Sequence, residues 1–424
     1  MWCPLPWTHL GVKNNGTLRM CSHSQSAGIG NTVLHHNSLP LTLDDLGKVD
    51  ILNCDTLKEV RKTMLTGEFP SQCNRCKIES NAGYRSRDQW ETLRHLNSYT
   101  KETAFANTLP DGTLINPQLQ DMDLRVGNQC NLRCVMCFPG EATKWYDDYK
   151  EIIGQDTFNV DGKVYSLIPI EGDFNWVRTK EKIELLLDNS QHLLKIKFGG
   201  GEPLMIKHHQ ELIEGLISRG YSSRIELEYS SNITIFPPRL FDLWKNFKLI
   251  KICASLDGIG LVNEAIRYPT NWNQVEENLK MLDNTEDHIE VFTSTTINLL
   301  NIEHYADTLV WLQDQNFKKI NKKAYSISAS HPVYNPKYLS ISILDNNEQQ
   351  KLFDTIMLKK SYSKDILDKV LFYKKFIDLT RVSDAKQHKK DFADRFYKFS
   401  KRQNQDWDMI FPFASRLVKE WNNV

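Results

Sequence analysis

An alternation of β-prone runs with amphipathic segments begins near residue 120 and constrains the fold more than any other feature. Six such runs are DMDLRV (121–126), LLKIKF (193–198), RIELEYS (224–230), LIKICASL (249–256), IEVFTSTTI (289–297) and AYSISAS (324–330). The segments between them, such as KHHQELIEGLISRG, carry apolar residues at three- and four-residue spacing, which is typical of helices. Repeated strand–helix units predict a parallel sheet covered by helices, either doubly wound or an incomplete barrel. Such sheets place their chemistry at the carboxyl ends of the strands.

Two further regions flank this repeat. Residues 1–118 are predicted to form a separate N-terminal domain, which ends in a linker rich in Pro, Gly and Asn. Residues 119–345 hold the strand–helix repeat, interrupted at 154–176 by what we expect to be an inserted hairpin. Strand-like runs stop near residue 345, so residues 346–424 are predicted to be a helical C-terminal extension.

The charge pattern argues against nucleic acid or membrane as a general partner. The chain has 53 Lys and Arg against 53 Asp and Glu, so no global field attracts it to a charged polymer. No apolar run reaches the length of a membrane span, and the first residues lack a secretory pattern. We therefore expect a cytoplasmic protein. The tail, residues 358–402, has 14 Lys and Arg against 6 Asp, which indicates a solvated helix face or, less favoured, an anionic or RNA contact.

Three cysteines, Cys130, Cys134 and Cys137, follow the first predicted strand with the spacing C-x3-C-x2-C. Clustered thiols in a reducing compartment point to zinc or iron–sulfur sites. A structural zinc site needs a fourth ligand, and no other His or Cys lies within ten residues of this motif. An iron–sulfur cluster held by three thiolates leaves one iron open, and an open metal position is where a substrate or cofactor binds.

The run CNLRCVMC, followed by GGEP at 200–203, closely resembles the radical S-adenosylmethionine (radical SAM) superfamily. The resemblance implies an α/β fold with a partial (β/α)6 TIM-type barrel and an enzyme that binds a 4Fe–4S cluster on the three cysteines. It also implies that the open iron binds S-adenosylmethionine. Reductive cleavage of this cofactor gives a 5′-deoxyadenosyl radical that abstracts a hydrogen atom from the substrate.

The same resemblance names candidate cofactor-binding residues. They are Gly200, Gly201, Glu202, Ser231, Asn232, Ser255, Asp257, Arg267, Asn298 and Met136. Glycines permit close backbone approach, and Glu202 would accept a hydrogen bond from the cofactor's ammonium group. Ser, Asn and Asp at strand ends are also common turn and cap residues, so a purely structural role stays open for them. Met136 departs from the family, which usually has an aromatic residue there.

A second set of cysteines comprises Cys3, Cys21, Cys73 and Cys76. Taken alone, CNRC resembles half of a zinc ribbon. Together with the sequence around it, including IESNAGYRSR (Glu79, Gly83, Ser86, Arg87), the set resembles the SPASM or twitch segment, which binds an auxiliary 4Fe–4S cluster. Two departures matter: this segment precedes the barrel instead of following it, and four ligands suffice for one cluster only. Four ligands close a cluster, so electron transfer or support is the expected role. Cys54 and Cys253 are left over.

The resemblance does not identify the substrate. We expect modification of a peptide or protein side chain, because residues 154–176 and the edge-like segment KYLSISIL (337–344) could pair with an extended peptide. The alternatives are dehydrogenation of a small sugar-like or nucleotide-linked molecule and, outside enzymes, a Cys-rich zinc or nucleic-acid-binding module. An electron donor such as flavodoxin or ferredoxin and a monomeric state are also expected. No catalytic acid or base is identified.

Overall fold

The structure is a computed structural model that describes residues 2–24, 33–168, 174–322, 328–359, 362–382 and 384–422. Eight strands form one mainly parallel sheet, in the order β12 (Ala329–Pro332), β11 (Ile289–Ile297), β10 (Leu249–Ser255), β9 (Glu226–Ser231), β8 (Lys195–Gly199), β5 (Asp121–Arg125), β1 (His9–Val12) and β2 (Leu18–Arg19). The chain divides into two compact units. The first comprises Met1–Gln129, Thr157–Ser230 and Phe236–Lys251, and the second Cys130–Asp156, Ser231–Ile235 and Ile252–Val424.

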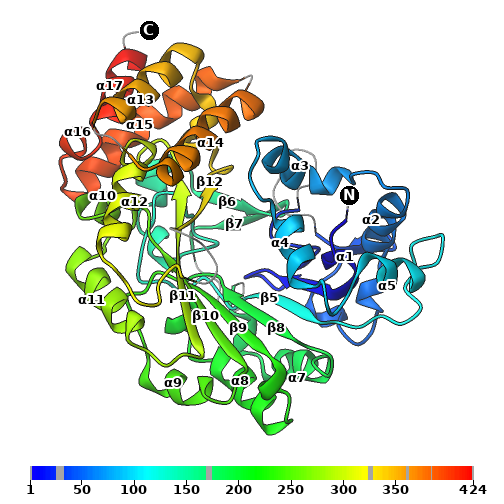
Figure 1. The fold of residues 1–424 in the computed structure, drawn as a ribbon. Helices are drawn as coiled ribbons and strands as arrows, with labels where there is room; N and C mark the ends of the chain where they lie inside the picture. The colour runs from blue at the N-terminus through cyan, green and yellow to red at the C-terminus, as the bar shows by residue number, and fades with distance from the viewer. Residues whose placement is uncertain are drawn as a thin grey trace. The chain divides into compact units, whose positions relative to one another are not determined.

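Five of the six predicted strands lie where the sequence places them, as β5, β8, β9, β10 and β11 (Figure 1). The sixth predicted run, 324–330, lies partly outside the described residues, and β12 begins at Ala329. The structure adds two strands that were not predicted, β1 and β2. Strand β1 pairs in parallel with β5, and β2 pairs antiparallel with β1. The α/β class is therefore confirmed, and the sheet includes part of the N-terminal region that we assigned to a separate domain. The predicted domain boundaries stay a prediction.

The two faces of the sheet in the first unit differ in chemistry. Side chains alternate between faces along a strand, so Met122, Leu124, Ile196 and Phe198 share one face and are fully buried. Helices α7 (Lys180–Asp188), α8 (His209–Ser218) and α9 (Pro238–Trp244) come after strands β5, β8 and β9 in the chain, respectively (Figure 1). The rings of Phe198 in β8 and His209 in α8 lie 5.1 Å apart, so α8 packs on the apolar face. The opposite face carries Asp, Arg, Lys and Glu side chains.

The remaining elements of the first unit are short. They are α1 (Leu5–Thr8), β3 (His35–His36), β4 (Leu39–Pro40), α2 (Asp55–Leu65), α3 (Asn74–Asn81), α4 (Arg87–Arg94), α5 (Lys101–Ala106), β6 (Thr157–Val160) and β7 (Lys163–Ser166). The hairpin predicted within 154–176 is confirmed, since β6 and β7 pair antiparallel. Its two-residue turn, Asp161 and Gly162, has positive φ at both positions, as a type I′ turn requires. Residues 169–173 of the predicted insert lie outside the described residues.

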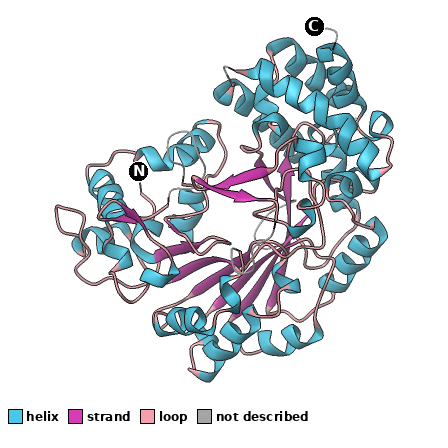
Figure 2. Ribbon diagram, turned by 180° about the vertical axis from the view of Figure 1, so that it is seen from behind, coloured by secondary structure: helices cyan, strands magenta, loops and turns pink. Residues whose placement is uncertain are grey.

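The second unit is mainly helical in its C-terminal part, as predicted (Figure 2). Its helices are α6 (Tyr149–Ile153), α10 (Leu261–Ile266), α11 (Trp272–Asp283), α12 (Tyr305–Asp314), α13 (Asn346–Lys359), α14 (Lys364–Thr380), α15 (Ala385–Gln403), α16 (Trp407–Ile410) and α17 (Pro412–Asn422). None of the described helices is both long and apolar enough to cross a membrane.

The prediction of an edge-like strand at 337–344 is wrong. This segment forms two 3-10 turns, Lys337–Leu339 and Ile341–Ile343. Residues 338–344 are all buried, so consecutive side chains pack inward on all sides instead of alternating between two faces. The segment therefore offers no free strand edge to a peptide.

Candidate functional site

The three-cysteine loop lies in the second unit and is held by backbone hydrogen bonds. The amides of Arg133 and Val135 donate to the carbonyls of Tyr268 (2.6 Å) and Ile266 (2.9 Å). The Cys134 carbonyl accepts from the amide of Cys137 and from the indole of Trp145, both at 3.0 Å. Cys134 is buried, whereas Cys130 and Cys137 are half-buried. The loop is thus fixed by its neighbours, and two of its three cysteines are half-buried.

Polar side chains of the second unit contact two of these thiols. Arg267 Nη1 lies 3.9 Å from Cys134 Sγ, and its Nη2 forms a 2.7 Å ion pair with buried Asp257. Asn232 Nδ2 lies 4.0 Å from Cys130 Sγ. A hydrogen bond from the Cys137 thiol lowers the pKa of Cys134, and the Arg267 guanidinium lowers it further. The surroundings of Cys134 therefore favour its thiolate, which is the form that binds metal.

Asp257 links Arg267 to the end of β11. Its Oδ1 accepts from the amide of Thr296 at 2.6 Å, and the side chain is fully buried. Burial raises the pKa of Asp257, while Arg267 opposes this rise. We predicted Arg267 as a partner for the cofactor's carboxylate. The structure pairs it with a carboxylate of the protein itself, so a role toward the cofactor stays a prediction.

The other predicted residues of the second unit stand at strand ends and form turns. Ser231 and Asn232 accept hydrogen bonds from the amides of Ile233 (2.9 Å) and Thr234 (3.0 Å). Asn298 accepts from the amide of Leu300 at 2.9 Å. Ser255 ends β10, and Met136 is half-buried within the cysteine loop. The turn-forming role left open for Ser231, Asn232 and Asn298 is therefore present, and their contacts with a cofactor remain predictions.

The GGEP turn lies in the first unit and is bonded to the residues that directly precede Cys130 in the chain. The amide of Gly201 donates to the Gly127 carbonyl (2.7 Å), and the amide of Glu202 donates to the Gln129 carbonyl (2.9 Å). A Cβ atom on Gly201 would lie 2.2 Å from the Gln129 carbonyl oxygen, and Gly200 has φ +115°. Only glycine fits these two positions. Glu202 is buried, and its Oε1 accepts from the amide of Leu204 at 3.1 Å.

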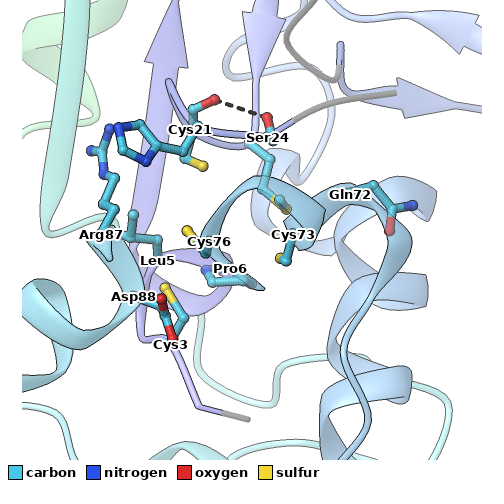
Figure 3. A pocket seen from close by; sticks show the side chains of 12 residues that line it. Cys3, Leu5, Pro6, Cys21, Ser24, Gln72, Cys73, Cys76, Arg87 and Asp88 are labelled. Carbon is cyan, nitrogen blue, oxygen red and sulfur yellow. Dashed lines mark hydrogen bonds between the residues drawn. The ribbon is translucent and has the colours of Figure 1, made fainter. Parts of the chain in front are cut away.

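The second set of cysteines comes together in the first unit. Cys3, Cys21, Cys73 and Cys76 are all buried and line one pocket, with Arg87 and Asp88 beside them (Figure 3). Burial raises the pKa of Cys3, Cys73 and Cys76, and the neighbouring thiols raise it further. Throughout the described part of the chain, no three His, Cys, Asp or Glu side chains are placed to hold a single metal ion.

Two features of the site were missed by the sequence analysis. The first is Arg133, which pairs with Asp148 at 2.7 Å, while Asp148 also pairs with Arg402 of α15. The basic tail thus contacts a residue that supports the cysteine loop. The second is the charged face of the sheet in the first unit. Its signal was visible as charges alternating with apolar residues in DMDLRV, LLKIKF and RIELEYS.

Comparisons with known proteins find the same family that the three-cysteine motif resembles. Residues 124–312 match the family model of the Radical SAM superfamily. An uncharacterized protein of Methanocaldococcus jannaschii is 25% identical over 198 residues, which cover 45% of this chain and 59% of the relative. The GTP 3′,8-cyclase of Helicobacter pylori is 28% identical over 134 residues, 32% of this chain and 33% of the relative. The chain thus spans less than two thirds of either relative.

Solved structures of S-adenosylmethionine-bound proteins resemble the chain only weakly. A tagged form of anSMEcpe with bound AdoMet has a TM-score of 0.36 at 15% identity, covering 63% of both chains. Streptococcus suis SuiB bound to S-adenosylmethionine has a TM-score of 0.34 at 12% identity, covering 82% of this chain and 67% of that one. Residues 124–312 thus match the Radical SAM superfamily, and that family implies S-adenosylmethionine and a 4Fe–4S cluster as cofactors.

Proposed function

We propose that this protein is a radical SAM enzyme that modifies a peptide or protein side chain and carries an auxiliary 4Fe–4S cluster. The observation that supports it most is the three-thiol loop, with the thiolate of Cys134 favoured by its surroundings, in a chain that matches the family over 124–312. When bound, the cluster and S-adenosylmethionine supply a 5′-deoxyadenosyl radical, and the protein's own residues hold and orient the reactants.

The residues present fit the 4Fe–4S cluster and the S-adenosylmethionine that the family implies. Three cysteines, two of them half-buried, form a donor set that leaves one iron of a cubane open. Cys130, Cys134 and Cys137 would hold the iron atoms. Gly200 and Gly201 would keep the backbone free of side chains where the amino-acid end of the cofactor approaches, and Glu202 would accept from its ammonium group. Arg267 would hold the thiolate of Cys134 in place.

The four buried thiols of the first unit fit a cluster with no open iron. Cys3, Cys21, Cys73 and Cys76 supply the four ligands that a closed cluster needs. Arg87 lines the same pocket, and a guanidinium beside thiolates offsets their negative charge. Such a site would pass or accept an electron, with flavodoxin or ferredoxin as the external donor, in a monomeric cytoplasmic enzyme.

A peptide substrate is supported by the β6–β7 hairpin. This two-stranded sheet exposes Val164, Ile168 just beyond it is exposed as well, and among the described strands β6 and β7 pair only with each other. An extended peptide could add to such an edge by backbone hydrogen bonds. With residues 337–344 folded into 3-10 turns, the hairpin is the remaining support for this mode of binding.

Reconstitution tests the proposal. The protein is loaded anaerobically with iron and sulfide, reduced, and incubated with S-adenosylmethionine. The expected result is a brown protein with about eight irons per chain, as two 4Fe–4S clusters require, that releases 5′-deoxyadenosine. A colourless protein that releases none would contradict radical SAM chemistry. About four irons together with one zinc per chain would contradict the auxiliary cluster alone.

A further inference from the structure

One face of helix α15 contacts residues that hold the three-cysteine loop in the second unit. Phe399, Arg402 and Gln403 share this face, because residues three and four positions apart lie side by side on a helix. Phe399 and Gln403 are buried, whereas 43% of the Arg402 side chain is exposed. Each of the three contacts a residue that is either in the loop's ion pair or bonded to the loop backbone. The C-terminal extension therefore reaches the loop by three routes.

The first route is ionic and runs through Asp148. Its Oδ1 accepts a hydrogen bond from Arg402 Nε, and its Oδ2 pairs with Arg133 Nε at 2.7 Å. Arg133 belongs to the loop itself, and its side chain is 3% exposed. Arg402 also pairs with Glu151 at 3.5 Å, so two cations and two carboxylates balance here. A buried guanidinium without a carboxylate is strongly unfavourable, so Asp148 holds Arg133, and Arg402 in turn holds Asp148.

The second route is aromatic and runs through Trp145. The ring centroids of Phe399 and Trp145 lie 5.8 Å apart with their planes at 86°, an edge-to-face arrangement. Trp145 is fully buried, and its indole N–H donates to the Cys134 carbonyl at 3.0 Å. The guanidinium carbon of Arg133 lies 5.7 Å from the centroid of the same ring. Helix α15 thus packs on the side chain that holds the backbone of Cys134.

The third route follows the carbonyl groups at the end of α10. Gln403 Nε2 donates to the carbonyl of Ala265 at 3.1 Å. The next carbonyl, that of Ile266, accepts from the amide of Val135 in the loop at 2.9 Å. Gln403 is itself held, because its Oε1 accepts from the indole of Trp407 at 3.3 Å. The same turn of chain therefore fixes both α15 and the loop backbone.

We propose that α15 is a positioning element of the three-cysteine site, and that Arg402 is the positioning residue through which it holds the loop. Supports of this kind keep ligands in the geometry that a metal group requires before the group binds. On this proposal Arg402, one of the cations of the basic tail, serves the loop and not an RNA or another anion. That the loop holds a cluster rests on the proposed function, whereas its coupling to α15 does not.

Alkylation of the metal-free full chain tests the coupling without a cluster. Iodoacetamide is added for a series of times, and mass spectrometry of the peptides gives the rate at each cysteine. Arg402→Gln should raise the rate at Cys134, the buried cysteine of the loop, by about fivefold, as loss of one charge-assisted hydrogen bond predicts. Arg402→Lys keeps the charge and should recover part of the protection. Cys253, buried in β10 of the same unit, should react at the wild-type rate in both variants.

Lys398→Gln is the matched control. Lys398 also lies on α15 with 38% of its side chain exposed, but it pairs with Asp394 of the same helix at 2.7 Å. Its loss should leave the alkylation rate of Cys134 unchanged. The proposal is overturned if Arg402→Gln reacts at Cys134 no faster than Lys398→Gln does. It is also overturned if Cys253 accelerates by the same factor as Cys134, because the whole unit would then have loosened.

Iron release from the reconstituted chain separates this proposal from the proposed function. In the presence of a chelator, Arg402→Gln should lose about four irons, the content of one 4Fe–4S cluster, faster than the wild type and the rest at the wild-type rate. Faster alkylation with unchanged iron release would overturn the role of α15 in a cluster site. A chain that binds no iron, yet shows the rise in Cys134 alkylation, would contradict the proposed function and still support the coupling of α15 to the loop.

Discussion

The two thiol sites of this protein differ in number of ligands and in burial. The loop of the second unit has three cysteines, of which Cys130 and Cys137 are half-buried. The pocket of the first unit has four, all buried. A three-thiolate cluster keeps an iron open for chemistry, whereas a four-thiolate cluster is saturated. We therefore propose that reaction and electron supply are separated between these two sites.

Cys134→Ala should have the largest effect and abolish 5′-deoxyadenosine formation. Cys134 is the buried member of the three-thiol loop and contacts Arg267. Its loss therefore removes one ligand of the cluster together with the contact to Arg267. The protein is reduced and incubated with S-adenosylmethionine, and the 5′-deoxyadenosine released is measured by chromatography. Cys253→Ala is the control, since Cys253 is buried in a small apolar cluster with Phe292 and Ala329 and should leave product formation intact.

Arg267→Gln should destabilise the protein by about 3 kcal/mol, because it leaves the buried carboxylate of Asp257 without its cation. The double variant Arg267→Gln/Asp257→Asn should recover much of this loss, since no unpaired charge remains. Denaturant unfolding measures both. Equal stability of the single and double variants would show that the pair is not coupled, and that Arg267 does not support the loop through Asp257.

Cys73→Ala/Cys76→Ala should remove the auxiliary cluster and retain cofactor cleavage. Two substitutions are needed, because a single one leaves three thiols in the pocket, a number that the other site uses to bind a cluster. Iron content should fall from about eight to about four per chain, the content of one 4Fe–4S cluster. If this well-folded variant loses 5′-deoxyadenosine formation as fully as Cys134→Ala, the separation of roles is wrong.

Chelation should distinguish the sites by a smaller, kinetic effect. A chelator reaches the less buried site first, and two of the three cysteines in the loop are half-buried whereas the four in the pocket are all buried. Iron release should therefore occur in two phases, with cofactor cleavage lost in the fast one. A single phase, or loss of cleavage in the slow phase, would contradict the assignment of the accessible cluster to catalysis.

The sequence predicted the parts of the structure that depend on local pattern. Five strands and the presence of a hairpin within 154–176 were predicted in this way. That Cys3 and Cys76 lie in one site was predicted only from the resemblance to a known segment. The pairing of β1 with β5 was missed, because His9 and Asp121 are register partners separated by more than a hundred residues and nothing local joins them.

The charged face of the sheet was missed for the same reason. Asp123 and Lys197 are visible as isolated charges in two β-prone runs, but only the register of β5 with β8 places them side by side. The wrong prediction at 337–344 has another cause. Its apolar residues fit a buried strand and a buried irregular segment equally well, and periodicity does not separate the two.

Electron paramagnetic resonance of the reduced protein, with and without S-adenosylmethionine, tests the central claim most directly. Binding of the cofactor to an open iron changes the spectrum of that cluster. The account predicts a change in the Cys73→Ala/Cys76→Ala variant, which keeps only the three-thiol cluster. It predicts none in a Cys130→Ala/Cys134→Ala/Cys137→Ala variant, which keeps only the four-thiol cluster. A cofactor-dependent change in the latter, or its absence in the former, would contradict the division between an open and a closed site.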